Sequence, residues 1–170
     1  MLTAAVYQLT KDKNLTADPN NSSFSIQTGE IRSRGIELEA KAAVNANVNV
    51  TASYTYTDAQ YQHDTTFNGK RPAEVPRNMA SLWADYTFHE TALSGLTVGA
   101  GARYVGSTVS YYKNDTSTGK KDDSFNVAGY ALMDATVKYD LARFGLPGSS
   151  IGVNVNNLFD REYVSSCYSE

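Results

Sequence analysis

Only a few residues of this sequence have types that could do catalytic or metal chemistry. The two histidines, His63 and His89, lie far apart, and neither has a partner at the spacing of metal ligands. No serine or cysteine is placed with histidine and acidic residues in the arrangement that an activated nucleophile needs. The sequence therefore predicts neither an enzyme nor a metal ion held directly by side chains.

A pair of glycines, Gly99 and Gly101, resembles part of a nucleotide-binding loop. The third glycine of that motif is missing, and no helix pattern follows the pair. We therefore expect these glycines to relieve crowding on a strongly twisted strand.

Aromatic and sulfur-containing side chains are the remaining candidates for binding. Tyr111 and Tyr112 stand side by side in a long polar segment, where their rings could stack on a ligand. Exposed loop tyrosines are also common without any function. The single cysteine, Cys167, cannot form an internal disulfide, so it is either a free thiol or half of a bridge to a residue outside the chain.

The segments that must position these residues alternate between apolar and polar side chains. From Val48 to Tyr56 every second residue is apolar, while the residues between them are polar. This period of two is typical of a strand with one apolar and one polar face. Similar alternation covers 36–42, 79–88, 96–107, 130–141 and 151–156, and a less regular version covers 2–10. The sequence predicts about seven strands of about ten residues, near the length that crosses a bilayer.

The connections between these strands alternate in length. Short ones at 43–46, 89–95 and 145–149 separate long polar ones at 11–28, 60–78 and 108–126. Tyr86, Phe88 and Tyr139 lie toward the short-turn end, and Tyr54, Tyr56 and Tyr104 lie toward the long-loop end. Short turns, long loops and two aromatic bands are typical of an outer-membrane barrel wall.

Charged side chains recur on the polar face of the predicted strands. They are Glu37, Glu39, Lys41, Asp85, Arg103, Asp134, Lys138 and Asp140. In a soluble sheet such rows would form a solvated face, whereas in a barrel they would line the interior.

Composition excludes several other classes of protein. The chain has 170 residues and a net charge of −3, and its pI of about 5.4 argues against a nucleic-acid partner. No run of 18 apolar residues is present, and the first ten residues do not have the pattern of a signal peptide. The mean hydropathy of −0.41 is compatible with a membrane barrel that has a wet interior and polar loops.

The interpretation that fits these patterns is an all-β fold, an antiparallel transmembrane β-barrel of the outer-membrane type. Two alternatives remain open from the residues alone. One is a small outer-membrane barrel with a structural or adhesive role, and the other is a soluble lipocalin-like barrel that binds a small hydrophobic ligand.

Three stretches of the sequence resemble a known family. They are GEIRSRGIELEA from Gly29 to Ala40, VPRNMASLWADY from Val75 to Tyr86, and VNNLFDREY from Val155 to Tyr163. Together they are similar to the carboxy-terminal barrel of TonB-dependent siderophore receptors, above all the hydroxamate class of ferrichrome and ferrioxamine receptors.

This resemblance implies a bacterial outer-membrane receptor with a barrel of roughly 22 strands and an amino-terminal plug. Such a receptor captures a ferric siderophore and imports it with energy from the TonB complex. The iron would be carried within the siderophore, so no cofactor is bound directly. Its other partner is the lipid of the outer membrane.

The resemblance also implies that residues 1–170 are the carboxy-terminal part of the barrel domain, without the plug, the TonB-contacting segment or the final strand. Cys167 matches the first half of a short disulfide in the last outer loop, with its partner expected beyond Glu170. Tyr168 matches an aromatic position near the siderophore pocket. Tyr168, Tyr111 and Tyr112 are therefore the predicted ligand contacts.

Overall fold

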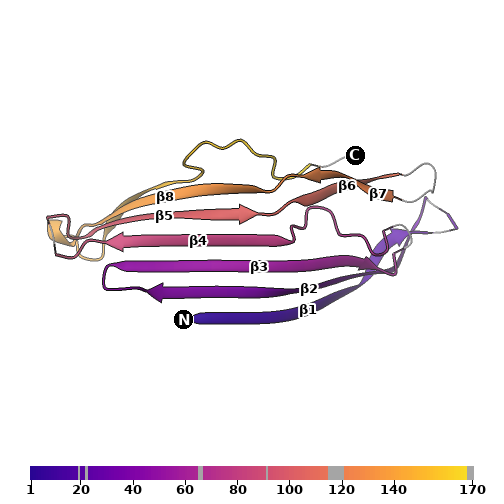
Figure 1. The fold of residues 1–170 in the computed structure, drawn as a ribbon, viewed down its shortest axis with the longest axis horizontal. Coiled ribbons are helices and arrows are strands. Elements are labelled where there is room, and N and C mark those ends of the chain that lie inside the picture. The colour runs from indigo at the N-terminus through magenta and orange to yellow at the C-terminus, as the bar shows by residue number, and fades with distance from the viewer. Residues whose placement is uncertain (19, 22, 65–66, 91, 115–120, 168–170) are drawn as a thin grey trace.

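In a computed structural model, the described part of the chain is almost entirely antiparallel β-sheet. The structure describes residues 1–18, 20–21, 23–64, 67–90, 92–114 and 121–167. Seven strands form one sheet in the order β1-β2-β3-β4-β5-β8-β9 (Figure 1). Their bounds are β1 Leu2–Ala17, β2 Ser25–Ala43, β3 Val48–Gln62, β4 Asn78–Thr87, β5 Leu96–Val105, β8 Tyr130–Asp140 and β9 Ser150–Val155. The predicted seven-stranded wall is confirmed.

Three predicted boundaries were wrong, all at the long-loop end. β1 and β2 extend into the predicted loop 11–28, and β3 extends to Gln62. The predicted loop 108–126 contains a hairpin of β6 (Thr108–Asn114) and β7 (Lys121–Val127), which continues beyond the ends of β5 and β8 (Figure 1). These extensions lie outside the apolar zone, so they need no apolar face and lack the alternation that reveals the other strands.

The register of the strands places the predicted apolar residues on one face of the sheet. One row across the sheet pairs Val50 with Ala84, Ala84 with Ala100, Ala100 with Ala135, and Ala135 with Val155. The irregular first strand joins the same face, because Leu2, Ala4 and Val6 pair with Ala40, Leu38 and Ile36. Since side chains alternate across a strand, the polar residues between them share the opposite face.

The apolar face has no covering layer within the described chain. Leu82 in β4 is 54% exposed and Val153 in β9 is 65% exposed, although both lie on this face. Buried apolar residues of the described chain include Ala59, Val109, Val127 and Leu132. A soluble sheet would bury its apolar face against a second layer, whereas lipid tails cover this face in a membrane barrel. We therefore call it the outward face and its opposite the inward face.

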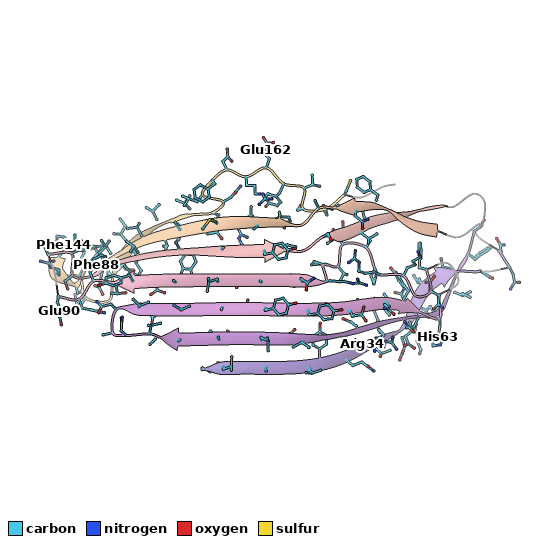
Figure 2. All side chains as sticks on the ribbon, viewed as in Figure 1. Arg34, His63, Phe88, Glu90, Phe144 and Glu162 are labelled. Atoms are coloured by element: carbon cyan, nitrogen blue, oxygen red, sulfur yellow. The ribbon has the colours of Figure 1, made fainter. Side chains whose placement is uncertain are left out.

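Aromatic side chains mark both ends of the outward apolar zone. At the short-turn end the rings of Tyr86 and Phe88 lie 4.7 Å apart between centroids. At the long-loop end the hydroxyl of Tyr54 donates to Asn78 Oδ1 at 2.8 Å. Figure 2 places Phe88, Glu90 and Phe144 together at the short-turn end, opposite Arg34 and His63.

The outward face becomes charged one step beyond Ile36 and Tyr56. There Arg34 Nε lies 3.3 Å from Asp58 Oδ2. This pair ends the apolar zone on β2 and β3, because lipid-facing strands carry charges only near the interface.

The short turns are tied to one another by side chains that reach the preceding turn. His89 Nε2 donates to the carbonyl of Ala46 at 3.0 Å. Arg143, in the short 3₁₀ helix η1 (Ala142–Phe144), donates to the carbonyl of Ala92 at 2.9 Å. Each of these two side chains therefore satisfies a backbone acceptor of the preceding turn, which ties the neighbouring strand ends together.

Candidate functional site

The inward face is a ladder of paired polar side chains. Neighbouring strands are joined by hydrogen bonds between Ser53 and Ser81 at 2.7 Å, Asn49 and Asp85 at 3.0 Å, Thr87 and Thr97 at 3.0 Å, and Thr136 and Asn154 at 2.6 Å. The strand register places the eight predicted charged residues on this same face. The structure therefore confirms their predicted placement on one polar surface.

The glycines Gly99 and Gly101 make room for the indole ring of Trp83 on the inward face. A Cβ atom at Gly99 would lie 2.8 Å from Trp83 Cζ2, and one at Gly101 would lie 2.5 Å from Trp83 Cε3. The prediction that these glycines relieve crowding holds, but the crowding group is a ring from the neighbouring strand. Sequence analysis did not single out Trp83, because only the pairing of β4 with β5 brings it over the glycines.

A second glycine on the inward face is crossed by a tyrosine. Tyr7, Gly35 and Thr57 lie in one row across β1, β2 and β3. The Tyr7 hydroxyl lies 3.0 Å from Thr57 Oγ1, so the ring spans the intervening strand. A Cβ atom at Gly35 would lie 2.8 Å from the Tyr7 hydroxyl and 2.1 Å from the carbonyl oxygen of Tyr56.

The long-loop end has a small core of its own. Val109 at the start of β6 is 1% exposed, and its carbonyl accepts the backbone N–H of Glu74 at 2.8 Å. The buried Asp64 accepts the N–H of Phe67 at 2.7 Å, which closes a turn in the 63–77 connection. The described part of this connection is therefore tied to β6 at Glu74.

One titratable group in this end region is perturbed. Tyr61 lies in the extension of β3 beyond the outward apolar zone, and its ring is 5.6 Å from that of Phe67. Burial raises the pKa of the Tyr61 phenol, and the nearby Asp64 carboxylate raises it further. The phenol therefore keeps its proton, and with it the capacity to donate a hydrogen bond, to a more alkaline pH than an exposed tyrosine would.

Of the predicted binding residues, the structure locates three. Tyr111 and Tyr112 belong to β6 at the long-loop end. Cys167 is a half-buried free thiol in the described chain, and its carbonyl accepts a hydrogen bond from the hydroxyl of Ser110 in β6. Tyr168 lies outside the described residues. The ligand contacts and the disulfide of Cys167 with a residue beyond Glu170 stay predictions.

The two histidines lie at opposite ends of the sheet. His63 Nδ1 is 3.5 Å from Glu30 Oε2, whereas His89 belongs to the short-turn end. Across the described ranges, no cluster of three or more His, Cys, Asp or Glu side chains could hold a metal ion. Within the same residues, no helix has the length and apolar character needed to cross a bilayer.

The sequence is similar to that of a family of known proteins. Residues 1–158 match the family described as TonB dependent receptor-like, beta-barrel. The chain is 57% identical over 169 residues to the ferrichrome outer membrane transporter/phage receptor of Escherichia coli, covering 99% of this chain and 21% of that protein. It is 40% identical to the ferrioxamine B receptor of Salmonella typhimurium, covering 98% of this chain and 22% of the receptor.

Solved structures agree on the fold. The ferric yersiniabactin uptake receptor FyuA of Yersinia pestis matches with a TM-score of 0.74 at 20% identity, covering 99% of this chain and 24% of the receptor. The ferric-catecholate import receptor Fiu of E. coli matches with a TM-score of 0.69 at 24% identity, covering 98% of this chain and 22% of Fiu.

These matches decide between the alternatives that the sequence left open. The chain spans about a fifth of the length of the curated relatives it matches. Those relatives are named as receptors and transporters, and neither name is that of an enzyme. A small complete barrel and a lipocalin-like barrel are both disfavoured, and the sheet is a part of an outer-membrane barrel wall. The chain belongs to the TonB-dependent receptor-like β-barrel family.

Proposed function

We propose that this chain is part of a receptor that takes up ferric siderophores of the hydroxamate type, such as ferrichrome, across the bacterial outer membrane. The observation that carries the proposal is the 57% identity to the ferrichrome transporter over almost the whole chain. Identity to the ferrioxamine B receptor is lower, at 40%. Ferrichrome is therefore the preferred ligand of the proposal.

The arrangement of the two faces is suited to this role. The outward face supplies an apolar surface for lipid, and the inward face supplies paired polar groups around a wet interior. Iron would stay within the siderophore, because hydroxamate oxygens satisfy Fe(III) and the protein would contact only the organic shell. We assign this contact to the long-loop end, where β6 carries Tyr111 and Tyr112.

The proposal extends to the rest of the receptor. Residues 1–170 would form the carboxy-terminal part of the barrel domain, and the plug would belong to another part of the same protein. Import would draw on the TonB complex, in keeping with the family to which the chain belongs. The inward face of the sheet would form part of the barrel wall that surrounds the path of the siderophore.

A hybrid receptor tests the proposal. The matching stretch of the E. coli ferrichrome transporter is replaced by residues 1–170 and produced in a strain that lacks this transporter. Uptake of ⁵⁵Fe-ferrichrome is then measured beside uptake of ⁵⁵Fe-ferrioxamine B and of a ferric catecholate. We expect saturable ferrichrome uptake that is abolished when the proton gradient is collapsed, and weak uptake of the other two.

The amount of folded receptor must be known for each measurement. Surface labelling and the shift in electrophoretic mobility on heating report how much hybrid is folded in the outer membrane. A folded hybrid that takes up ferrioxamine B or the catecholate better than ferrichrome would contradict the ligand assignment. A folded hybrid that takes up none of them would contradict the function.

A further inference from the structure

One acidic side chain on the inward face joins three separate parts of the chain. The carboxylate of Asp134 in β8 accepts hydrogen bonds from Arg103 in β5, with Nε at 2.8 Å and Nη2 at 3.2 Å. The same carboxylate accepts the backbone N–H of Asn157 at 2.8 Å. The Asp134 side chain is 17% exposed, against 49% for Arg103. Charge-assisted bonds of this length are among the stronger hydrogen bonds in proteins.

Asn157 begins a closed turn just after β9. Its φ of 53° lies in the left-handed region, which asparagine tolerates better than most residues. The Asn157 side chain accepts the N–H of Arg161 and donates to the Arg161 carbonyl, both at 3.0 Å. The turn is thus closed internally. Two of its backbone N–H groups tie it to β8, that of Asn157 through the Asp134 carboxylate at 2.8 Å and that of Leu158 through the carbonyl of Met133 at 2.6 Å.

From this turn the chain runs along β8 toward the long-loop end. Arg161 donates to the carbonyl of Ala131 at 3.2 Å, and the rings of Tyr163 and Tyr130 lie 4.2 Å apart between centroids. Glu162 lies on the outer side of this arching segment (Figure 2). The last described residue of the segment is Cys167, whose carbonyl accepts a hydrogen bond from the hydroxyl of Ser110 in β6. The segment 157–167 therefore connects an ion pair on the inward face to the strand that carries the predicted ligand contacts.

We propose that Asp134 is a positioning residue for ligand capture, which holds the turn at Asn157 and thereby sets the position of segment 157–167 against β6. Arg103 orients the Asp134 carboxylate toward the Asn157 N–H. The proposal rests on the proposed function, because it assumes that β6 borders the ligand. The backbone bond is the essential part, since the ion pair alone would join only β5 and β8.

Four changes in the hybrid receptor separate the ion pair from the backbone bond. Asp134→Ala removes both. Asp134→Asn keeps an acceptor for the Asn157 N–H but removes the charge. The double variant Arg103→Asp/Asp134→Arg restores an ion pair between the two strands, but the guanidinium at 134 cannot accept the Asn157 N–H. Asp85→Ala is the matched control, because Asp85 is an inward carboxylate that bonds Asn49 and not the turn.

Two measurements are made on each variant. The first is the KM and the Vmax per surface receptor for ⁵⁵Fe-ferrichrome uptake, and the second is the rate of tryptic cleavage after Arg161. We expect Asp134→Ala and the double variant to raise KM about tenfold or more with Vmax unchanged, as the loss of one hydrogen bond to a charged group would do. Both should also speed cleavage after Arg161. Asp134→Asn and Asp85→Ala should leave both values within about twofold of the unmodified hybrid.

Restoration of the unmodified KM and cleavage rate by the double variant would overturn the proposal, because the ion pair would then suffice. It would also be overturned if Asp134→Ala lowered only the amount of folded receptor, or if Asp85→Ala had the same effect as Asp134→Ala. If the unmodified hybrid takes up no ferrichrome, the proposed function fails. The cleavage rates then still decide whether Asp134 holds the turn.

Discussion

The indole ring of Trp83 lies across Gly101, its register partner on the neighbouring strand, and occupies the space that a side chain there would need. The ring also covers Gly99, so one residue of β4 fills the position of two side chains of β5. A glycine in a strand has no side chain to pack on its neighbours. An aromatic ring from the adjacent strand that covers the glycine stabilises the sheet at that position. This contact leads to the first of four predictions.

Alanine substitutions at Gly99 and Gly101 should both destabilise the receptor, but a smaller side chain at position 83 should restore stability mainly for the substitution at Gly99. At Gly99 the closest groups to an added Cβ are side-chain atoms of Trp83 and Thr136, whereas at Gly101 the carbonyl of Leu82 also lies within 2.6 Å. Gly99→Ala and Gly101→Ala should each cost about 1–3 kcal/mol of stability through overpacking. Adding Trp83→Leu should restore much of the loss for Gly99→Ala and little of it for Gly101→Ala.

Thermal unfolding of the hybrid receptor, followed by the loss of the folded band in electrophoresis, measures this difference. Trp83→Leu alone provides the reference for both double variants. If Trp83→Leu restored stability equally for Gly99→Ala and Gly101→Ala, the Leu82 carbonyl would not be what prevents a side chain at position 101.

The two faces of β4 should respond differently to a positive charge. Leu82→Arg places a guanidinium in the middle of the outward face and should cost about 2–4 kcal/mol in the bilayer. Its neighbour Ser81 points to the inward face, where Ser81→Arg meets polar groups and water. We expect a large drop in folded outer-membrane receptor for Leu82→Arg and a small one for Ser81→Arg. Similar losses for both would contradict the assignment of the faces.

In the row of Tyr7, Gly35 and Thr57, an added side chain at Gly35 should lower stability more than loss of the hydrogen bond between Tyr7 and Thr57. Gly35→Ala would bring Cβ within 2.1 Å of a backbone carbonyl, so the backbone must move. Its cost should lie at the upper end of the about 1–3 kcal/mol that overpacking brings. Tyr7→Phe removes only the bond to Thr57 and should cost about 0.5–1.5 kcal/mol. If thermal unfolding showed a larger loss of stability for Tyr7→Phe than for Gly35→Ala, close packing would not explain why a glycine stands at position 35.

The predicted ligand contacts can be tested one residue at a time. We expect an effect from Tyr111→Ala and from Tyr112→Ala, each made singly in β6. Each variant should raise the KM for ferrichrome uptake about tenfold, as the loss of an aromatic contact of about 1.4 kcal/mol would do. Tyr168→Ala should act in the same direction. Tyr86→Ala, on the outward face at the other end, is the control for a nonspecific loss of an aromatic side chain.

Much of the wall could be predicted because each strand satisfies a local rule. Alternation from Val48 to Tyr56 already assigns the outward and inward sides of β3, and the register confirms that the neighbouring strands agree. The hairpin of β6 and β7 was missed for the same physical reason. Where a hairpin projects into water, neither face must be apolar, and its residues carry no period-two signal.

The sequence by itself determined the strand pattern, the two faces and the family, because alternation and motifs are properties of neighbouring residues. Only the tertiary structure decided which residues meet across the sheet. Arg103, Asp134 and Asn157 are separated by 31 and 23 positions, and Trp83 reaches its glycines only through the pairing of β4 with β5. Such contacts depend on strand register and on the path of the chain after β9. Both are set by packing and hydrogen bonding over the whole sheet and not by any local run of residues.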